Sequence, residues 1–211
     1  MSISAIRREY HRRVLRRKDL DPDPFDQFRT WFRHAVKAQR VDPNAMVLAT
    51  ADSRGRPSAR TLLLKGLDDR GFAFYTNYRS RKGRELATNR HAALVFYWPV
   101  LERQVCITGH VSRIPRRESE AYFSSRPRLS RLAAWVSSQS HVIAGRAALD
   151  EALERLVAKY RGRDVPLPPY WGGYCLCPVA IEFWQGRPNR LHDRFLYTRR
   201  GKRWLIQRLA P

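Results

Sequence analysis

Short apolar segments separated by turn sequences dominate this 211-residue chain. Two of the turns combine aspartate with glycine, at 52–55 and 68–71, and each lies between segments rich in apolar residues. Neighbouring strands joined by such tight turns pair antiparallel, as hairpins. The pattern therefore predicts an antiparallel sheet, with strands at 46–51, 58–67, 72–75, 91–98, 102–114, 179–185, 192–199 and 203–209.

Helical segments interrupt these strands. Asp23 offers an N-cap and Pro24 suits the first helical position, so a helix is expected from there to about Gln39. Ser80 is placed to cap a second, short helix. Further helices are predicted over 116–124, 129–135 and 147–160. Hairpins with inserted helices indicate an α+β fold, built on a barrel or a strongly coiled sheet with peripheral helices.

The composition fits a globular protein, whereas the charge needs its own explanation. Hydrophobic residues make up 43% of the chain, enough for a sizeable core. We expect a basic N-terminal arm at 1–22 and a single domain at 23–211. The formal net charge is +22. A nucleic-acid partner, a general preference for arginine and the attraction of small anionic ligands are all open, and the scatter of basic residues favours the second.

Several classes of protein are disfavoured. The longest apolar run, 92–101, is too short to span a membrane, and no apolar segment follows the basic N-terminus as in a signal peptide. Three cysteines, Cys106, Cys175 and Cys177, form neither a disulfide framework nor a zinc pattern. We therefore expect a cytoplasmic protein with no metal and no membrane partner. Because the basic residues are scattered along the chain, we also expect no specific nucleic acid.

Two segments combine basic side chains with hydroxyl groups, which suits a phosphate. Arg60 and Lys65 bracket the stretch Thr61-Leu62-Leu63-Leu64, but on a flat strand they would face opposite ways, so a bulge or two ligands would be needed. Tyr75-Thr76 precede Ser80-Arg81-Lys82 at a helix start, where free backbone N–H groups favour an anion. An edge strand and an ordinary capped helix are the alternatives.

Two further sets of residues suit a phosphorylated aromatic ligand. Tyr122, Arg126 and Ser130 recur every four residues and could clamp a phosphate, although Pro127 interrupts the helix and a surface turn is the alternative. Gln104, Gln139-Ser140 and Trp184 could contact the edge and face of a flat heterocycle, although a tryptophan in a strand is more often core.

The run Arg190-Leu191-His192-Asp193-Arg194 alternates basic with other residues. In a strand, Arg190, His192 and Arg194 would project from one face. Two guanidiniums flanking an imidazole repel each other, so a bound anion would bring them together; a solvated edge strand is the alternative. Asp193, on the opposite face, is expected in a structural salt bridge.

Taken together, these segments resemble the pyridoxamine (pyridoxine) 5′-phosphate oxidase family over nearly the whole chain. The resemblance implies an FMN-binding split β-barrel, antiparallel and Greek-key-like, in a homodimer with FMN at the subunit interface. The blocks that carry it are Arg60-Thr61-Leu62-Leu63-Leu64-Lys65, Ser80-Arg81-Lys82, Leu101-Glu102-Arg103-Gln104-Val105, Ser125-Arg126-Pro127-Arg128, Trp135-Val136-Ser137-Ser138-Gln139-Ser140, Ile181-Glu182-Phe183-Trp184-Gln185-Gly186 and Arg190-Leu191-His192-Asp193-Arg194-Phe195.

The resemblance also implies an activity and the residues that carry it. Pyridoxamine or pyridoxine 5′-phosphate would be oxidised to pyridoxal 5′-phosphate, most simply by hydride transfer from C4′ to flavin N5, with O2 as acceptor and release of H2O2, and of ammonia from the amine. The implied FMN contacts are Arg60, Thr61, Leu62, Leu63, Leu64, Lys65, Tyr75, Thr76, Arg81, Lys82, Gln104, Gln139, Ser140, Trp184 and Arg194. The implied substrate contacts are Arg7, Arg8, Glu9, Tyr10, Lys65, Tyr122, Arg126, Ser130, Arg190, Leu191 and His192. Arg190 and His192 are also assigned to catalysis, and the arm at 1–22 to covering the site.

Two other functions compete with this interpretation. A related FMN oxidase could use the same fold and flavin site on another aromatic, such as a phenazine precursor. Tyr122, Arg126, Ser130, Arg190 and His192 together favour a phosphorylated B6 substrate instead. A polyanion-binding protein would follow from the charge and from the basic segment 7–18.

Overall fold

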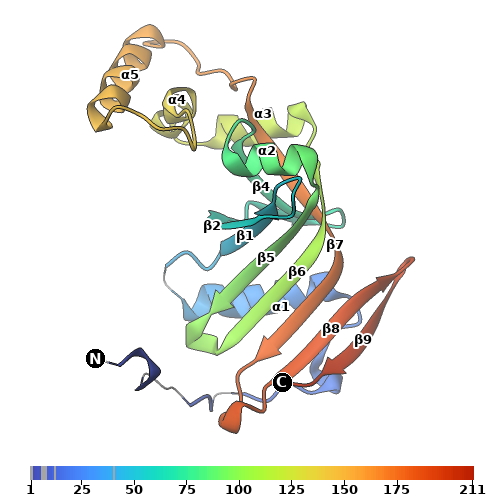
Figure 1. The fold of residues 1–211 in the computed structure, drawn as a ribbon. Coiled ribbons are helices and arrows are strands. Elements are labelled where there is room, and N and C mark those ends of the chain that lie inside the picture. The colour runs from blue at the N-terminus through green and yellow to red at the C-terminus, as the bar shows by residue number, and fades with distance from the viewer. Residues whose placement is uncertain (1, 6–8, 12, 40) are drawn as a thin grey trace.

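The computed structural model describes residues 2–5, 9–11, 13–39 and 41–211, and it shows an antiparallel sheet with helices around it (Figure 1). The strands are β1 (Ala45–Ala51), β2 (Pro57–Leu63), β3 (Gly66–Asp68), β4 (Gly71–Asn77), β5 (His91–Trp98), β6 (Arg103–Arg113), β7 (Trp171–Gln185), β8 (Asp193–Arg200) and β9 (Arg203–Leu209). The α-helices are α1 (Pro24–Ala38), α2 (Arg81–Thr88), α3 (Arg116–Ser125), α4 (Arg128–Val136) and α5 (Arg146–Lys159). Short 3-10 turns are η1 (Ile3–Ala5), η2 (Arg17–Asp19), η3 (Pro99–Leu101) and η4 (Pro188–Arg190). The predicted α+β class is confirmed.

The sheet divides along one edge of β7. Its strands run in the order β2-β1-β5-β6-β7-β4-β3, and β8 also pairs with β7 and carries β9. On the side away from β6, β4 pairs with residues 171–176 of β7, whereas β8 pairs with residues 180–185. Pro178 lies between the two stretches and has no N–H to donate. Opposite it, the register shifts between Thr108 and Gly109 of β6, so the sheet bends where it splits.

A link of two residues joins the first and the last strand of this sheet order. β2 ends at Leu63 and β3 begins at Gly66, so only Leu64 and Lys65 separate the first strand of the order from the last. The sheet must therefore curl until its ends are neighbours. The predicted continuous strand over 58–67 is wrong, because the chain leaves β1 at this point and pairs with β4 instead.

Helix α1 fills the concave side of the curled sheet. Asp23 caps it, its carboxylate accepting a 2.7 Å hydrogen bond from the N–H of Phe25, as predicted. The fully buried ring of Phe28 contacts Phe72 of β4 and Phe96 of β5, each at 5.0 Å between ring centroids. Because β6 and β7 separate those two strands in the sheet, the contacts require the curl.

A second, smaller core forms where α3, α4 and α5 pack at one end of the sheet (Figure 1). It contains Phe123, Leu132, Val165, Leu167 and Trp171. None of the helices in the described ranges is long and apolar enough to cross a bilayer.

Strand β7 is much longer than the predicted 179–185. Its first half includes Gly172 and Gly173, which weaken any strand signal in the sequence. A side chain at Gly173 would meet the ring of Tyr75 and the side chain of Ile114, both at 2.7 Å. Glycine is therefore required here by close packing, which a local pattern does not reveal.

The N-terminal arm is anchored to the last strands. Leu15 and Leu20 are buried in the main core. Asp193 accepts a hydrogen bond from the Leu15 N–H at 3.0 Å and pairs with Arg208 at 2.8 Å and Arg187 at 3.4 Å, confirming its predicted structural salt bridge. The division into an arm at 1–22 and a domain at 23–211 stays a prediction.

Candidate active site

Fourteen of the described members of the predicted site lie in two groups, and the others are placed separately below. One group surrounds the start of α2 and comprises Arg60, Tyr75, Thr76, Arg81, Lys82, Tyr122, Arg126, Ser130 and Gln139; we call it the α2 group. The other surrounds the start of β8 and comprises Tyr10, Gln104, Trp184, His192 and Arg194; we call it the β8 group.

Five members of the α2 group line a cavity of about 330 Å³. Tyr75 and Tyr122 stack at 3.9 Å between ring centroids, and Trp171 stacks with both, at 5.6 Å from Tyr75 and 6.2 Å from Tyr122. Of the predicted site residues, Leu62, Tyr75, Thr76, Arg126, Ser130 and Gln139 line this cavity. The helix break at 126–127 does not prevent Tyr122, Arg126 and Ser130 from converging, because α3 and α4 turn around it.

Arg126 brings to this cavity a positive charge that forms no ion pair with the residues the structure describes. Its guanidinium lies 4.7 Å from the centroid of Trp171, and its buried Nη1 atom has no hydrogen-bond partner among those residues. Burial lowers the pKa of Arg126. A buried donor on a cation is costly unless an acceptor reaches it, so this atom fits an anionic ligand.

Lys82 is a second cation without a partner acid. It is 5% exposed, and its Nζ lies 3.3 Å from Gln139 Oε1 and 3.4 Å from Thr76 Oγ1. Within the described ranges, no carboxylate forms an ion pair with it. Burial, together with the neighbouring Arg60, lowers its pKa to about 8. Ser80 caps α2, as predicted, by accepting from the Gly83 N–H.

The predicted run from Arg60 to Lys65 is divided among different surroundings. Arg60 joins a network around Glu85, and Leu64 is buried in the main core. Lys65 lines a separate cavity of about 530 Å³, beside Phe28 and Phe32. Thr61 is exposed. The described residues that line the 330 Å³ cavity do not include Thr61, Leu63 or Ser140.

The β8 group is a cluster of rings. Trp184 and His192 lie 4.7 Å apart between centroids, and Tyr10 meets both edge-on, at 5.6 and 5.7 Å. Gln104 pairs with Trp184 across the β6–β7 ladder, and Trp184 pairs with Arg194 across β7–β8. These residues therefore share one face of the sheet.

Charge in the β8 group is compensated. Arg194 donates from Nε and Nη2 to the two oxygens of Glu182, at 2.7 and 3.0 Å. Burial and the nearby Arg190 and Arg194 lower the pKa of His192, so its ring is mainly neutral at pH 7. Its Nδ1 lies 3.1 Å from the Arg187 N–H and accepts from it, which leaves the proton on Nε2.

The expected alternation over 190–194 is wrong at its start. Arg190 belongs to η4 and has a positive φ of 62°, and β8 begins only at Asp193. A strand alternation therefore does not set the direction of Arg190, which sits on a tight turn after Pro188. Leu191 is 68% exposed. Arg7 and Arg8 lie outside the described residues, while Glu9 accepts from the Asn189 N–H at 3.4 Å.

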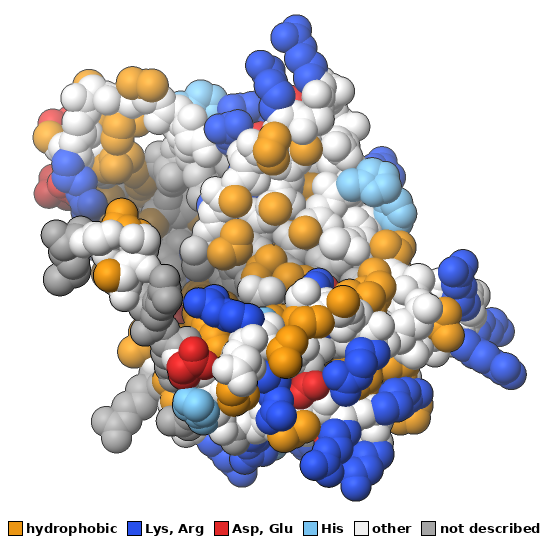
Figure 2. Space-filling model, turned by 60° about the horizontal axis from the view of Figure 1, so that its bottom comes forward, with side chains coloured by type: hydrophobic (Ala, Val, Ile, Leu, Met, Phe, Trp, Pro, Cys, Tyr) orange, Lys and Arg blue, Asp and Glu red, His pale blue; other side chains and the backbone are white. Residues whose placement is uncertain are grey.

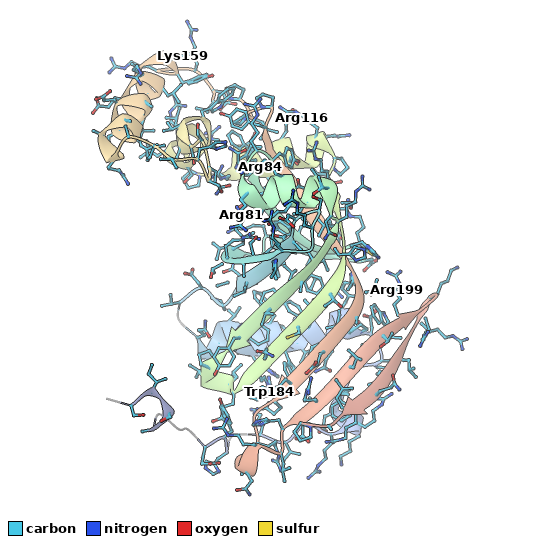
Figure 3. The ribbon with its side chains drawn as sticks, in the orientation of Figure 1. Arg81, Arg84, Arg116, Lys159, Trp184 and Arg199 are labelled. Atoms are coloured by element: carbon cyan, nitrogen blue, oxygen red, sulfur yellow. The ribbon has the colours of Figure 1, made fainter. Side chains whose placement is uncertain are left out.

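The two groups lie far apart within one chain. Tyr75 pairs with Gly173 near the start of β7, whereas Trp184 lies eleven residues further along the same strand. At 3.3 Å per residue, this corresponds to roughly 36 Å. Figure 3 shows Arg81 at one end of the sheet and Trp184 at the other.

The sequence reasoning missed two acids that hold the predicted arginines. Glu182 holds Arg194, and Glu85 bonds Arg81 and Arg60. The i,i+4 spacing of Arg81 and Glu85 was a signal for the second contact.

Comparison with known proteins supplies the family. The sequence pattern described as "Pyridoxamine 5'-phosphate oxidase" matches residues 32–160, and that described as "Pyridoxine 5'-phosphate oxidase C-terminal dimerisation region" matches residues 171–211. The chain belongs to the pyridoxamine 5′-phosphate oxidase family. The predicted resemblance is thereby confirmed, together with its split-barrel fold, its class of FMN-dependent oxidoreductase and its homodimeric state.

The similarity to named relatives extends along the whole chain. Proteins named pyridoxine/pyridoxamine 5′-phosphate oxidase from Paraburkholderia phymatum and Cyanothece sp. are 57% and 54% identical, each over 100% of this chain and 99% of the relative. The structure of PhzG from Burkholderia lata, in complex with tetrahydrophenazine-1-carboxylic acid, is 34% identical, with a TM-score of 0.88 over 94% of this chain and 98% of PhzG.

The residues present fit a phosphorylated flavin. Lys82 and the buried Nη1 of Arg126 are donors that lack an anionic acceptor among the described residues. Trp184, Tyr10 and His192 offer ring faces and edges at the other end of the sheet.

Proposed function

We propose that this protein oxidises pyridoxamine 5′-phosphate or pyridoxine 5′-phosphate to pyridoxal 5′-phosphate, with O2 as the final acceptor and H2O2 as a product. The observation that carries the proposal is the buried, unpartnered Nη1 of Arg126 at a cavity that Ser130 also lines, beside the stacked Tyr75 and Tyr122. A guanidinium and two hydroxyls suit a phosphate monoester. The names of the 54–57% identical relatives support the same substrates.

Each site is built from two chains in this proposal. The α2 group of one chain and the β8 group of the other would face the same ligands, since roughly 36 Å of β7 separates the two groups within one chain. The dimerisation region at 171–211 contains β7, β8 and β9, and so contains Trp184, His192 and Arg194. A twofold axis would then give two equivalent sites, with FMN at the interface.

In this proposal the residues of the chain bind FMN and the substrate and orient them. FMN supplies the two-electron chemistry when it is bound. In our proposal Arg60, Arg81 and Lys82 hold the FMN phosphate, and Thr76 and Gln139 donate or accept beside it. Gln104, Trp184 and Arg194 contact the flavin from the partner. Thr61, Leu62, Leu63, Leu64, Tyr75 and Ser140 are assigned to FMN by family resemblance alone.

The substrate would be held at both of its ends. Tyr122, Arg126, Ser130 and Lys65 anchor its phosphate, and Arg190 presses over its ring. Neutral His192 would donate a hydrogen bond from Nε2 to a ring substituent, because its Nδ1 already accepts from the backbone. Tyr10, packed against Trp184 and His192, would exclude water, together with Arg7, Arg8 and Glu9 of the arm and Leu191.

A related oxidase activity on a phenazine precursor is the second candidate. The 34% identity to PhzG favours it less than the 54–57% identity to the named B6 oxidases favours the first. Polyanion binding ranks third. Basic side chains occur around much of the outline of the face in Figure 2, rather than forming one continuous stripe.

The proposal is tested by assaying the purified yellow protein for H2O2. Pyridoxamine 5′-phosphate should give peroxide and pyridoxal 5′-phosphate in equal amounts. Unphosphorylated pyridoxamine should react far less efficiently, since it lacks the anchor for Arg126. Turnover of a phenazine precursor with no turnover of either B6 phosphate would support the second candidate instead.

A further inference from the structure

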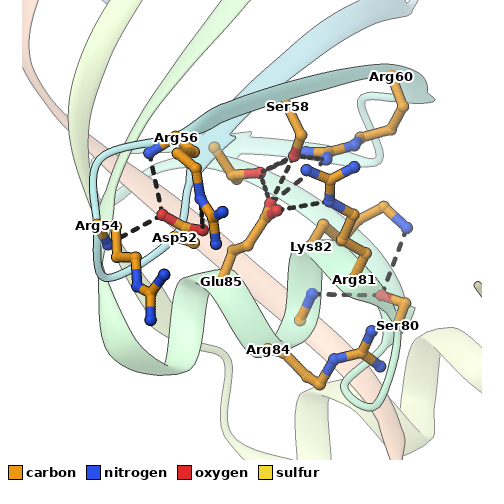
Figure 4. Close-up of polar contacts among 12 residues, drawn as sticks. Asp52, Arg54, Arg56, Ser58, Arg60, Ser80, Arg81, Lys82, Arg84 and Glu85 are labelled. Carbon is orange, nitrogen blue, oxygen red and sulfur yellow. Dashed lines mark hydrogen bonds and ion pairs between the residues drawn. The ribbon is translucent and has the colours of Figure 1, made fainter.

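Glu85 is a buried acid that contacts Arg60 and Arg81 of the α2 group and has no part in the reaction proposed above. Its side chain is 5% exposed. Its Oε2 atom accepts hydrogen bonds from Thr50 Oγ1 at 2.5 Å and from Ser58 Oγ at 2.6 Å. Thr50 lies on β1 and Ser58 on β2, so the carboxylate of helix α2 is tied to two strands (Figure 4).

The same carboxylate holds two arginines. Arg81 donates from Nε to Oε1 at 2.8 Å, and Nη2 of Arg60 lies 3.5 Å from Oε2. Arg60 is held further by Thr50 and Ser58, the hydroxyls that also bond Glu85. Arg81 uses only Nε in this contact and its side chain is 60% exposed, so its two terminal nitrogens remain for a ligand.

The charges of this network match a phosphate. Arg60, Arg81 and Lys82 contribute three positive charges and Glu85 one negative charge, which leaves +2. A phosphate monoester carries about −1.5 to −2 at pH 7. Burial by itself would raise the pKa of Glu85, but hydrogen bonds from Ser58, Thr50 and Arg81 lower it to about 2. The acid therefore stays ionised and keeps the cations together before any ligand arrives.

We propose that Glu85 is a positioning residue, which fixes Arg60 and Arg81 in the geometry that receives the phosphate of FMN. This inference rests on the proposed assignment of those arginines to FMN. Glu85 itself does not touch the phosphate, because its two oxygens are directed at Thr50, Ser58 and the guanidiniums.

Simple electrostatics predicts the opposite effect of removing this acid. A negative charge beside the site repels a phosphate, so Glu85→Gln should tighten FMN binding if Glu85 acted by its charge alone. If Glu85 positions the arginines, the same variant should weaken FMN binding, because the guanidiniums must then be ordered at the moment of binding.

The experiment is a titration of the FMN-free full-length protein, followed by flavin fluorescence, with two ligands. FMN carries the phosphate, and riboflavin is the same flavin without it. We expect Glu85→Gln to raise the Kd for FMN about tenfold, equivalent to the loss of one charge-assisted hydrogen bond, and to leave the Kd for riboflavin unchanged. Added to Arg81→Ala, it should cause a smaller further loss than it causes alone, because only Arg60 then remains for Glu85 to position.

Glu120→Gln is the matched control. Arg116 and Glu120 form the same i,i+4 pair on α3, at 3.0 Å, with both side chains about half exposed. This variant should change neither Kd. If Glu85→Gln fails to fold, Thr50→Val loosens the carboxylate without removing its charge and should weaken FMN binding about threefold, again with riboflavin unchanged.

Two results separate failure of this inference from failure of the proposed assignment. Arg60→Ala should weaken FMN far more than riboflavin; equal effects on both ligands would remove this cluster from the phosphate site. If Arg60→Ala behaves as expected but Glu85→Gln leaves FMN binding unchanged, tightens it or weakens both ligands alike, Glu85 is not a positioning residue.

Discussion

The two ends of the sheet differ in how their basic side chains are paired with acids. At the α2 end, Glu85 pairs with Arg60 and Arg81, but neither Lys82 nor Nη1 of Arg126 forms an ion pair within the described ranges. At the β8 end, Arg194 is bonded to both oxygens of Glu182. A buried cation that no acid pairs favours a bound anion, whereas a paired cation is already satisfied. This difference supports our proposal, in which the phosphates bind at the α2 end and the rings at the β8 end.

The two ends are also held differently. The α2 group rests on strands β2 and β4 and on the capped start of α2, and also on α3 and α4 beside the second core. The β8 group depends on the η4 turn and on Tyr10 of the arm. Substitutions at the α2 end should therefore act on binding of phosphates, and those at the β8 end on orientation of the rings.

The largest effect is expected from Arg126→Ala. If Arg126 bonds the phosphate as proposed, losing its guanidinium should lower kcat/KM for pyridoxamine 5′-phosphate about 100-fold, mainly through KM, in steady-state assays of H2O2 release. Activity on unphosphorylated pyridoxamine should hardly change. An equal loss on both substrates would show that Arg126 does not read the phosphate.

Mixing defective chains should restore activity. Arg190→Met should lower kcat/KM strongly while FMN stays bound. Co-expression of Arg126→Ala with Arg190→Met should then recover about one quarter of the wild-type rate at low substrate, because half of the dimers are mixed and each has one intact site of two. Pairs of variants from the same end should recover nothing. No recovery in the mixed preparation would contradict a site shared between chains.

Lys65→Ala should have a smaller effect. Lys65 lines a separate cavity beside Phe28, yet family resemblance assigns it to the substrate phosphate. Loss of one charge-assisted hydrogen bond of about 1.5 kcal/mol corresponds to roughly a tenfold rise in KM, with kcat little changed. An unchanged KM would show that Lys65 does not bind the substrate phosphate and only lines the 530 Å³ cavity beside Phe28.

The smallest effect concerns pH. Lys82 has its pKa lowered to about 8, chiefly by burial, and it must be protonated to attract phosphate. The Kd for FMN should be nearly flat between about pH 7 and 8, where the phosphate is largely dianionic, and rise by a few-fold between pH 8 and 9, in fluorescence titrations. The contribution of Lys82 to folding stability has the opposite sign: it increases from pH 8 upward, since the unfolded chain then binds more protons. In Lys82→Met, the rise in Kd should disappear.

Local patterns predicted most elements of the fold. The Asp23 cap and the Ser80 cap, the helices and the hairpins depend on contacts within a few residues, and these are confirmed. The failures involve long-range packing. The break after Leu63 and the length of β7 depend on which strand lies alongside, and Gly173 is explained only by Tyr75 across the sheet.

The candidate site divides in the same way. Spacing left Tyr122, Arg126 and Ser130 open between a phosphate clamp and a surface turn, and the family resemblance assigned them to the site. Arg126 and Ser130 line one cavity, and Tyr122 stacks on Tyr75 beside it, even though the helix breaks between them. The alternation at Arg190 and His192 failed, because a 3-10 turn replaces the strand there. Glu182 was missed because an ion pair between two strands leaves little mark on spacing, whereas Glu85 could have been found from its i,i+4 spacing to Arg81.

The sequence by itself determined which chemistry is available: phosphate-binding side chains, flat rings and the family to which their order belongs. Only the tertiary structure decided where that chemistry lies, because strand β7 is long and its edge divides between β4 and β8. That division moves Trp184 and Arg126 to opposite ends of one sheet. Pairings between strands distant in the chain set these positions, and no local preference encodes them.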